Sequence, residues 1–289
     1  MTQEPMAAGE VERHRHAVES VRERRDASLR DPMGWLTLVG LHWLTTGEQR
    51  FGSDPGGEIV LHAEERAVPP LAGRLDLADG QVHVRPLAGV SLMVNGEPVL
   101  DGLRLANDEE DEPTVLELAS LRMYLIRRGE DRLALRVKDV ASEALRAFAG
   151  LDYYPIDPRW RVTGRLIPAT PGASITVPDI VGDVLPLPTP GDVVFEFGAA
   201  THRLHALEAQ PGHLWLVFGD DTNGTETYGG GRFLVTGPVQ PDDSVEIDFN
   251  LTYNPPCVFS PFATCPLPPE GNRLPMRVEA GEQMWSSHA

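Results

Sequence analysis

Hydrophobic and polar positions alternate with a helical period near the N-terminus and with a strand period over most of the remaining chain. Between residues 10 and 30, four aliphatic residues recur at about helical spacing, with Glu and Arg between them. Asp31-Pro32 ends this pattern, because the residue before a proline is biased away from helical conformation. We therefore predict a helix within residues 1–31. Its apolar stripe is narrow, so the helix is expected to pack on a β domain or on a partner chain of a homo-oligomer.

Short runs with a period of two fill two further regions, and turn residues separate them. The first region contains EIVLH, GRLDLADGQVHV, SLMVNGEPVL, TVLEL, RMYLIRR and RLALRV. Within it, Asp79-Gly80 and Asn95-Gly96 favour the positive φ angles of tight hairpin turns. The second region contains VVFEF, HRLHALE, HLWLVF, GRFLVT, SVEIDFNL and LPMRVEA. Many short strands with such turns are typical of a β-sandwich or a β-barrel.

Prolines at positions 155 and 158 predict an extended crossover, which places a division of the chain near residue 160. We therefore predict a mainly β protein in three parts. Residues 1–31 form the N-terminal helix, residues 32–160 a β-sandwich, and residues 161–289 a second antiparallel β sheet or barrel. Residues 248–273 are rich in proline, which cannot continue a helix, and are predicted to be an ordered loop that closes the second β domain.

The runs FGSDPGGEIVL and VNGEPV resemble those of a forkhead-associated (FHA) domain, a β-sandwich that binds phosphothreonine peptides. This resemblance implies a phosphate-binding arginine directly after Gly52, but Ser53 occupies that position. The Ser-x-x-His region of that family falls near Val68-Pro69-Pro70, where neither residue type is present. We therefore predict an FHA-like sandwich that does not bind phosphothreonine.

Charge and composition restrict the partners and the compartment. The chain is acidic, with a formal net charge of −18, which repels polyphosphate and argues against nucleic acid as a partner. No apolar run approaches the roughly 20 residues that cross a bilayer, and the first residues lack the apolar core of a secretory signal. These features predict a cytoplasmic protein without membrane contact. The chain's two cysteines are accordingly expected to be reduced thiols.

Residues 248–273 read DFNLTYNPPCVFSPFATCPLPPEGNR. The elements DFN-x-x-YNPPC, CPLPP and the following Asn resemble the C-terminal signature of a family of prokaryotic proteins known as a domain of unknown function. The run TNGTETYGGGRF resembles another part of that signature. Where the family has a basic residue and an alanine after DFN, this chain has Leu251 and Thr252, so no positive charge is expected there. The resemblance implies neither an activity nor a cofactor.

The run GDDTNGTETYGGGR lies between two strand-like segments, and Asn223-Gly224 within it predicts a two-residue hairpin turn. Such a turn would place Asp221 opposite Glu226 and Trp215 opposite Arg232. Two like charges in opposition require water, an arginine or a cation between them. The alternative is an exposed hairpin tip with solvated carboxylates. The consecutive glycines that follow predict a bulge or a close approach of the backbone.

Polar side chains of this hairpin and of the Pro-rich loop are predicted to line a small-molecule site. The candidate ligand-binding residues are Glu226, Tyr228, Arg232, Asp248, Asn250, Tyr253, Asn254, Cys257, Cys265 and Asn272. No catalytic residue or cofactor is assigned to them, and whether the protein is an enzyme stays open. The alternative function is a non-catalytic protein-interaction module that uses the N-terminal sandwich and helix. A deep pocket beside the polar residues favours the first function, and a flat apolar patch on the sandwich favours the second.

Neither the cysteines nor the histidines of this half predict metal chemistry. Structural zinc normally takes four Cys or His ligands at short spacings, which Cys257 and Cys265 do not supply. His202, His205 and His213 offer an alternative metal site, but strand alternation places the first two on opposite faces. We therefore predict no metal site. A nucleophilic cysteine needs a base or a positive field, so buried structural thiols are the favoured interpretation over a nucleophile.

Overall fold

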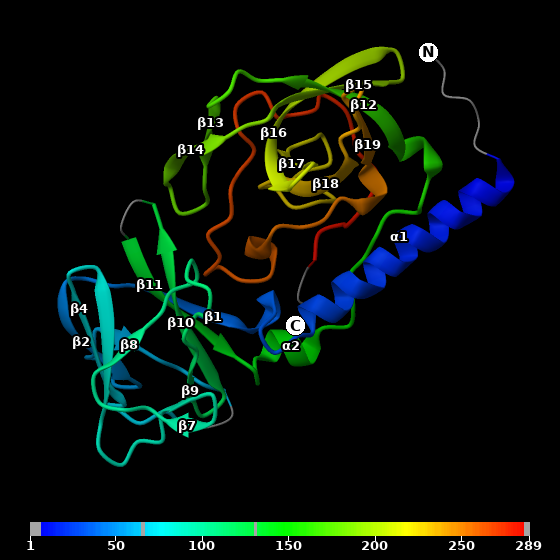
Figure 1. Ribbon diagram of the computed structural model, residues 1–289. Coiled ribbons are helices and arrows are strands. Elements are labelled where there is room, and N and C mark those ends of the chain that lie inside the picture. Colours follow the sequence, from blue (N-terminus) through cyan, green and yellow to red (C-terminus); the bar gives the residue numbers. More distant parts are fainter. Residues whose placement is uncertain (1–6, 65–66, 130–131, 286–289) are drawn as a thin grey trace. The chain divides into compact units, whose positions relative to one another are not determined.

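The computed structural model of the protein describes residues 7–64, 67–129 and 132–285, which form two compact units (Figure 1). One unit comprises residues 29–148, and the other combines residues 1–28 with residues 149–289. The observed division thus differs from the predicted one near residue 160. Residues 149–160 join the second unit because Tyr153 forms a β-bridge with Glu282 and Trp160 belongs to that unit's hydrophobic core. The mainly β architecture predicted from the sequence is confirmed.

The unit of residues 29–148 is built from two sheets that enclose one hydrophobic core. The first sheet has the order β1-β11-β10-β9-β6-β7, with bounds Leu38–Trp43, Arg132–Asp139, Leu121–Arg128, Leu116–Leu118, Met93–Val94 and Glu97–Pro98. The second has the order β3-β2-β4-β5-β8, with bounds Ile59–Val60, Gly47–Gly52, Gly73–Ala78, Gln81–Pro86 and Leu103–Leu105. A 3-10 turn η1 (Trp35–Thr37) precedes β1, and the short helix α2 (Glu143–Ala147) follows β11.

Both Asn/Asp-Gly hairpins of this unit are confirmed. Asp79 and Gly80 have φ angles of 52° and 71° between β4 and β5, and Asn95 and Gly96 have 52° and 78° between β6 and β7. Left-handed backbone at both central positions is what a two-residue turn between twisted strands requires. The likeness to FHA domains stays a prediction. At the position of the missing arginine, the hydroxyl of Ser53 donates to the carbonyl of Val68 at 2.7 Å.

The second unit contains helix α1 (Ala8–Leu29) and a nearly closed, barrel-like antiparallel sheet (Figure 1). The sheet has the order β18-β17-β16-β15-β12-β19, with bounds Arg232–Pro238, His213–Phe218, Ala200–Gln210, Gly191–Phe197, Arg161–Pro168 and Ser244–Asp248. The two edge strands, β18 and β19, lie close together. A separate ribbon pairs β13 (Ser174–Pro178) with β14 (Val184–Pro188). Among the described residues, no helix is long and apolar enough to cross a membrane.

The chain after β19 closes this sheet without adding a strand to it. It contains two short 3-10 turns, η3 (Phe249–Leu251) and η4 (Pro256–Val258). Phe249, Leu274 and Val278 are buried in the same hydrophobic core as the strands. The strand predicted for LPMRVEA is therefore wrong, although its apolar positions do face the core. A side chain binds part of the backbone of that segment: the guanidinium of Arg232 donates hydrogen bonds to the carbonyls of Val278 and Ala280.

The two-residue hairpin predicted at Asn223-Gly224 is also wrong. Strands β17 and β18 pair Phe218 with Arg232, so a long loop of residues 219–231 connects them. The chain leaves β17 because the carboxylate of Asp220 accepts hydrogen bonds from the amide of Thr222 at 2.8 Å and from its hydroxyl at 2.6 Å. This local side-chain turn replaces the ladder that the alternation suggests.

The predicted close backbone approach does occur at Gly231. Its φ angle is +89°, and a Cβ atom there would lie 2.6 Å from the carbonyl oxygen of Phe218 and 2.7 Å from Pro268 Cγ. We expect Gly231→Ala to lower the free energy of unfolding by about 2 kcal/mol or more, because the left-handed backbone and the contacts both oppose a side chain.

The matched control for this substitution is Gly229→Ala, two residues away. A Cβ atom at Gly229 would meet no atom closer than 3.8 Å. Its effect should stay within about 0.5 kcal/mol, the range of ordinary surface changes. Urea denaturation of both variants measures the difference, and equal losses would contradict a specific close approach at Gly231.

Candidate functional site

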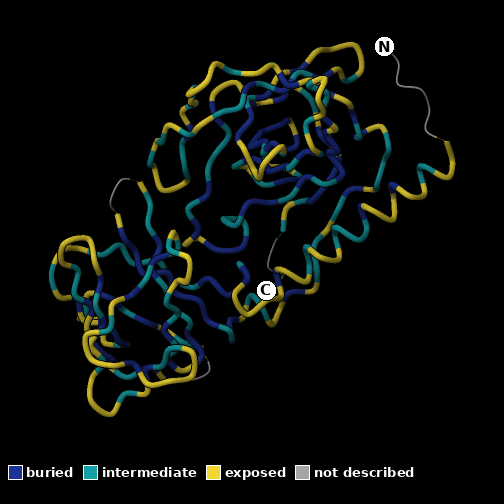
Figure 2. The backbone as a smooth tube through the Cα atoms, in the orientation of Figure 1, coloured by how far each residue is buried: buried dark blue, intermediate teal, exposed yellow. Residues whose placement is uncertain are grey.

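Helix α1 presents polar side chains to the β domain of its own unit. His14, Val18, Arg22 and Arg25 are spaced three or four residues apart, which places them on one face of the helix. Val18 is buried, and so is His14, which is 8% exposed. Figure 2 shows covered and exposed positions alternating along the helix. Polar as well as apolar contacts therefore attach α1.

The buried face of α1 places the imidazole of His14 against the carboxylate of Asp248, at the end of β19. His14 Nε2 lies 2.6 Å from Asp248 Oδ2, and both side chains are almost fully buried. The other oxygen of Asp248 accepts hydrogen bonds from the backbone amide of Asn250 at 3.0 Å and from its side-chain amide at 2.8 Å. Asn250 is itself bound to the backbone of Asp157. Asn250 thus fixes one oxygen of the Asp248 carboxylate, and the other oxygen orients the imidazole of His14.

A cavity of about 390 Å³ opens beside this pair, between α1 and strands β12 and β19. Its lining residues are Glu10, Arg13, His14, Ala17, Val18, Val21, Arg161, Glu246, Asp248 and Leu251. Arg161 faces Asp248 across the β12–β19 pair and forms an ion pair with Glu246. The second ring nitrogen of His14, Nδ1, is buried and has no hydrogen-bond partner among the described residues. A buried polar atom without a partner calls for an explanation. Arg22 Nε and Arg232 Nε are in the same state, but neither residue lines this cavity.

Two more of the candidate residues, Tyr253 and Asn254, lie near the buried carboxylate of Glu282, which contacts α1 through Arg25. Glu282 Oε1 accepts a hydrogen bond from Arg25 Nε at 2.9 Å, and its Oε2 accepts one from the backbone amide of Asn254 at 2.7 Å. Burial raises the pKa of Glu282, while Arg25 acts in the opposite direction. The guanidinium of Arg25 also lies over the ring of Tyr253, 5.3 Å from its centroid. These contacts fasten the C-terminal segment to the helix.

Tyr228, Cys257 and Cys265 form a separate group. The backbone amide of Cys257 donates to the sulfur of Cys265 at 3.1 Å, and the two thiols are hydrogen-bonded to each other. The hydroxyl of Tyr228 is hydrogen-bonded to the thiol of Cys257. Both cysteines are thiols. The fold thus brings these three candidates together, although the loop of Tyr228 and that of the cysteines are far apart in sequence.

The side chains of Arg232 and Asn272 are buried, and both bind groups of the protein itself. Arg232 pairs with Asp220 at 2.9 Å with both side chains 0% exposed, and it donates to the carbonyls of Val278, Ala280 and Glu282. The two carboxylates expected to oppose each other in the hairpin have other partners: Asp221 pairs with Arg273, and Glu226 pairs with Arg277.

Asn272 binds backbone atoms of His205 and Val217 with its side-chain amide. Glu226 lies at the surface, where it pairs with Arg277 and accepts a hydrogen bond from the hydroxyl of Tyr154. These residues maintain the fold and do not line the cavity beside His14.

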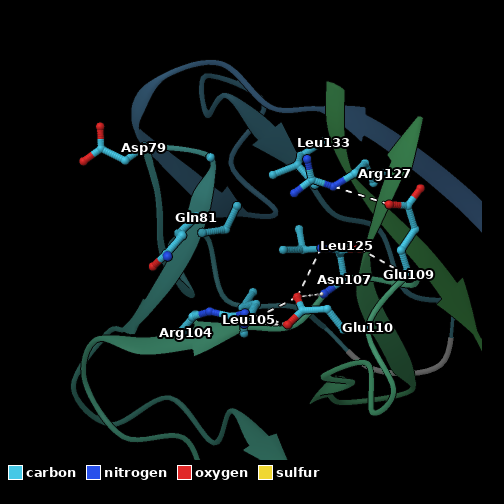
Figure 3. A pocket seen from close by; sticks show the side chains of 12 residues that line it. Asp79, Gln81, Arg104, Leu105, Asn107, Glu109, Glu110, Leu125, Arg127 and Leu133 are labelled. Atoms are coloured by element: carbon cyan, nitrogen blue, oxygen red, sulfur yellow. Dashed lines mark hydrogen bonds and ion pairs between the residues drawn. The ribbon is translucent and has the colours of Figure 1, made fainter. Parts of the chain in front are cut away.

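The sandwich unit has a cavity of its own, of about 500 Å³ (Figure 3). Four of its five charged residues form ion pairs, and the fifth is Asp79. Glu110 accepts hydrogen bonds from Arg104 and from the side chain of Asn107, and Arg127 lies 3.7 Å from Glu109. Dashed lines in Figure 3 mark these contacts, and none reaches Asp79. The cavity beside His14 also contains paired charges, through Arg161, but the buried nitrogen of His14 without a partner distinguishes it.

The three histidines considered for a metal site are bound elsewhere. His202 stacks on Phe195, the imidazole of His205 is hydrogen-bonded to Asp192, and that of His213 to the carbonyl of Thr236. Within the part of the chain that the structure describes, no three His, Cys, Asp or Glu side chains are grouped to hold a metal ion.

Comparison with known proteins adds to this geometry. Residues 146–283 match the model of a family described as "Protein of unknown function (DUF1684)". The C-terminal part of the chain belongs to this family. Its predicted resemblance to a family of unknown function is thereby confirmed, whereas the particular loop signature stays a prediction. The DUF1684 match includes Asp248, Tyr253 and Glu282 but not α1, so His14 comes from outside the matched segment.

One solved structure similar to this chain is that of an uncharacterized protein of Haloarcula marismortui, determined by solution NMR. The two are 31% identical over 49% of this chain and 80% of that chain, with a TM-score of 0.41. No curated protein matches this chain.

Sequence reasoning missed His14, Arg25 and Glu282. Asp248 and Asn250 were identified because strand alternation puts them on the less apolar face of β19. His14 is separated from Asp248 by 234 positions, and no local pattern relates the two. One signal was available: His14 falls in the same helical stripe as Val18, where an apolar residue would be expected.

The burial of the Arg232–Asp220 pair predicts a large mutational effect. Arg232→Ala leaves Asp220 as an uncompensated buried charge, so we expect a loss of about 3–5 kcal/mol in the free energy of unfolding. Arg277→Ala is the control, since Arg277 pairs with Glu226 and Glu279 at the surface and should leave the denaturation midpoint nearly unchanged. Chemical denaturation of both variants tests this, and similar midpoints would show that the buried pair does not stabilise the fold.

Proposed function

We propose that the protein is a cytoplasmic enzyme that binds a small polar molecule in the cavity beside α1, and that His14 exchanges a proton with it. One observation carries this proposal. The imidazole of His14 is buried, its Nε2 is 2.6 Å from Asp248 Oδ2, and its Nδ1 has no partner among the described residues. The residue also lines a cavity of about 390 Å³.

The chemistry of a histidine held by a carboxylate supports this role. An ionised carboxylate only accepts hydrogen bonds, so Asp248 keeps the proton of the imidazole on Nε2. Nδ1 then carries a lone pair and can take a proton from a bound molecule. A positioned acid or base of this kind contributes about 10²–10⁴-fold to a reaction rate. Asp248 does not itself react; together with Asn250 it fixes the orientation of the ring.

The lining of the cavity indicates the class of ligand. Its volume lies at the lower end of the range of about 300–1,000 Å³ that is common for ligand pockets. Arg13 and Arg161 supply positive charge, and Glu10 and Glu246 supply negative charge. A small molecule that carries both hydrogen-bond acceptors and donors fits this lining better than a large apolar one. No substrate within that class is assigned.

The competing proposal is a protein-interaction module that uses the sandwich and the helix. A flat apolar patch on the sandwich would support it. The sandwich has the charged cavity of Figure 3, and the helix face that carries His14 is covered by the β domain of its own unit. The ligand-sized cavity beside an open polar atom therefore favours a small-molecule site.

A ligand screen with two histidine variants tests the proposal. Polar metabolites would be screened by thermal shift on the wild-type protein, and each stabilising compound would be followed by NMR for turnover. His14→Gln keeps an amide N–H for Asp248 but cannot exchange a proton, so we expect turnover to fall at least about 10²-fold while folding is retained. His16→Gln is the matched control, because His16 lies on the exposed side of the same helix.

The two variants separate binding at this site from binding elsewhere. Compounds that stabilise the wild type and His16→Gln, and that only those two proteins convert, support the proposal. If no compound stabilises the wild type, or if His14→Gln converts every compound at the wild-type rate, the proposal is wrong. Circular dichroism of each variant shows whether a lost activity reflects lost folding.

A further inference from the structure

The two cysteines of the Pro-rich loop form a site that the proposed function does not use. Turn η4 places Cys257 next to Cys265, so that its backbone amide donates to the sulfur of Cys265 at 3.1 Å. The thiols are hydrogen-bonded to each other, and the hydroxyl of Tyr228 is hydrogen-bonded to Cys257. If the cysteines only filled space in the core, their sulfur atoms would not need hydrogen-bonding partners. Here each thiol is hydrogen-bonded to the other, and a hydroxyl is bonded to one of them.

The two cysteines differ in their access to solvent. Cys265 is 3% exposed, whereas Cys257 is partly exposed. A small reagent from solution would therefore reach Cys257 first and would find Cys265 directly behind it. This is the arrangement of a reacting thiol with a second thiol that can follow it.

The surroundings of Cys257 also favour its reactive form. The thiolate is the nucleophile, and it forms more readily where hydrogen-bond donors surround the sulfur. The hydrogen bond from Cys265 lowers the pKa of Cys257 to about 7, and the hydroxyl of Tyr228 acts in the same direction against the effect of burial. Burial raises the pKa of Tyr228, so this tyrosine keeps its proton near neutral pH and remains a donor.

We propose that Cys257 and Cys265 are a two-cysteine redox site that reduces a small hydroperoxide. The thiolate of Cys257 attacks one oxygen of the hydroperoxide, the O–O bond breaks, and the leaving oxygen takes a proton to become water or an alcohol. Cys257 is then a sulfenic acid. The thiol of Cys265 attacks this sulfur, an S–S bond forms, and the hydroxyl group leaves with a proton as water. The two cysteines lose two electrons, which the hydroperoxide gains.

This site is independent of the cavity beside His14, because it shares none of the residues that line that cavity. The reaction needs no metal, because the two electrons that the thiols lose are the two that the hydroperoxide gains. A small dithiol reductant would restore the pair by thiol–disulfide exchange. The reactivity predicted for Cys257 replaces the buried structural thiol that sequence reasoning favours.

Oxidation of the full chain by hydrogen peroxide tests the proposal. Near neutral pH and with a few equivalents of peroxide, the wild type should lose both free thiols together and about 2 Da of mass. Cys265→Ser should stop at a sulfenic acid that dimedone traps on Cys257. Cys257→Ser should react at least about tenfold more slowly, because Cys265 is buried.

A tyrosine variant distinguishes a built site from a merely exposed thiol. The alkylation rate of Cys257 by iodoacetamide should rise with pH to a midpoint near 7 in the wild type, as its thiolate forms. In Tyr228→Phe the midpoint should move to higher pH, and peroxide oxidation should slow at neutral pH but not in alkaline solution. Tyr154→Phe, a tyrosine hydrogen-bonded to Glu226 and not to a thiol, is the control and should leave the midpoint unchanged.

Three results would overturn the proposal. They are retention of both thiols by the wild type, equal oxidation rates of Cys257→Ser and Cys265→Ser, and unchanged pH profiles in Tyr228→Phe. Glutathione disulfide, tested in parallel, should react more slowly than hydrogen peroxide. If it were the faster oxidant, the site would exchange disulfides and would not be a peroxide-reducing site.

Discussion

The buried guanidinium of Arg232 holds together the unit that contains the candidate site. It sits on strand β18, pairs with Asp220 and donates to three carbonyls between residues 278 and 282. That segment lies outside the described strands, and the arginine satisfies three of its backbone carbonyls. Held in this way, Glu282 meets Arg25 on α1, and the helix carries His14 to Asp248. An arginine far from the cavity thus supports the placement of the imidazole.

Asparagine side chains perform a related task in the Pro-rich loop. Proline removes backbone donors, and the loop runs through a buried region where polar groups need partners. Asn250, Asn254 and Asn272 each bind backbone atoms of another segment with their side-chain amides. An amide side chain carries both a donor and an acceptor, as the peptide group does, and can replace a missing ladder. Loop residues that sequence reasoning assigned to a ligand are therefore partly explained by the fold.

Local sequence patterns correctly predicted the turns and strand faces that depend only on neighbouring residues. Asn95-Gly96 determines its own turn, and the alternation in SVEIDFNL correctly separated Val245 and Ile247 from Asp248. The hairpin at Asn223-Gly224 failed because the bond between Asp220 and Thr222 and the distant pairing with Arg232 outweigh the local turn preference. The candidate site was half predicted for the same reason. Its carboxylate follows from strand alternation, but its histidine is brought there only by the fold.

The polar attachment of α1 also bears on how the chain is made. Asp248 follows His14 by 234 positions, so at about 5–20 residues per second a ribosome needs roughly 10–50 s to produce the partner of a helix already synthesised. A wide apolar face would stay exposed for that time and invite aggregation. A face that carries His14, Arg22 and Arg25 can remain hydrated until the segments that contain Asp248 and Glu282 have been synthesised. The cost of replacing apolar contacts with buried polar contacts is thus offset during synthesis, when the helix is still exposed to water.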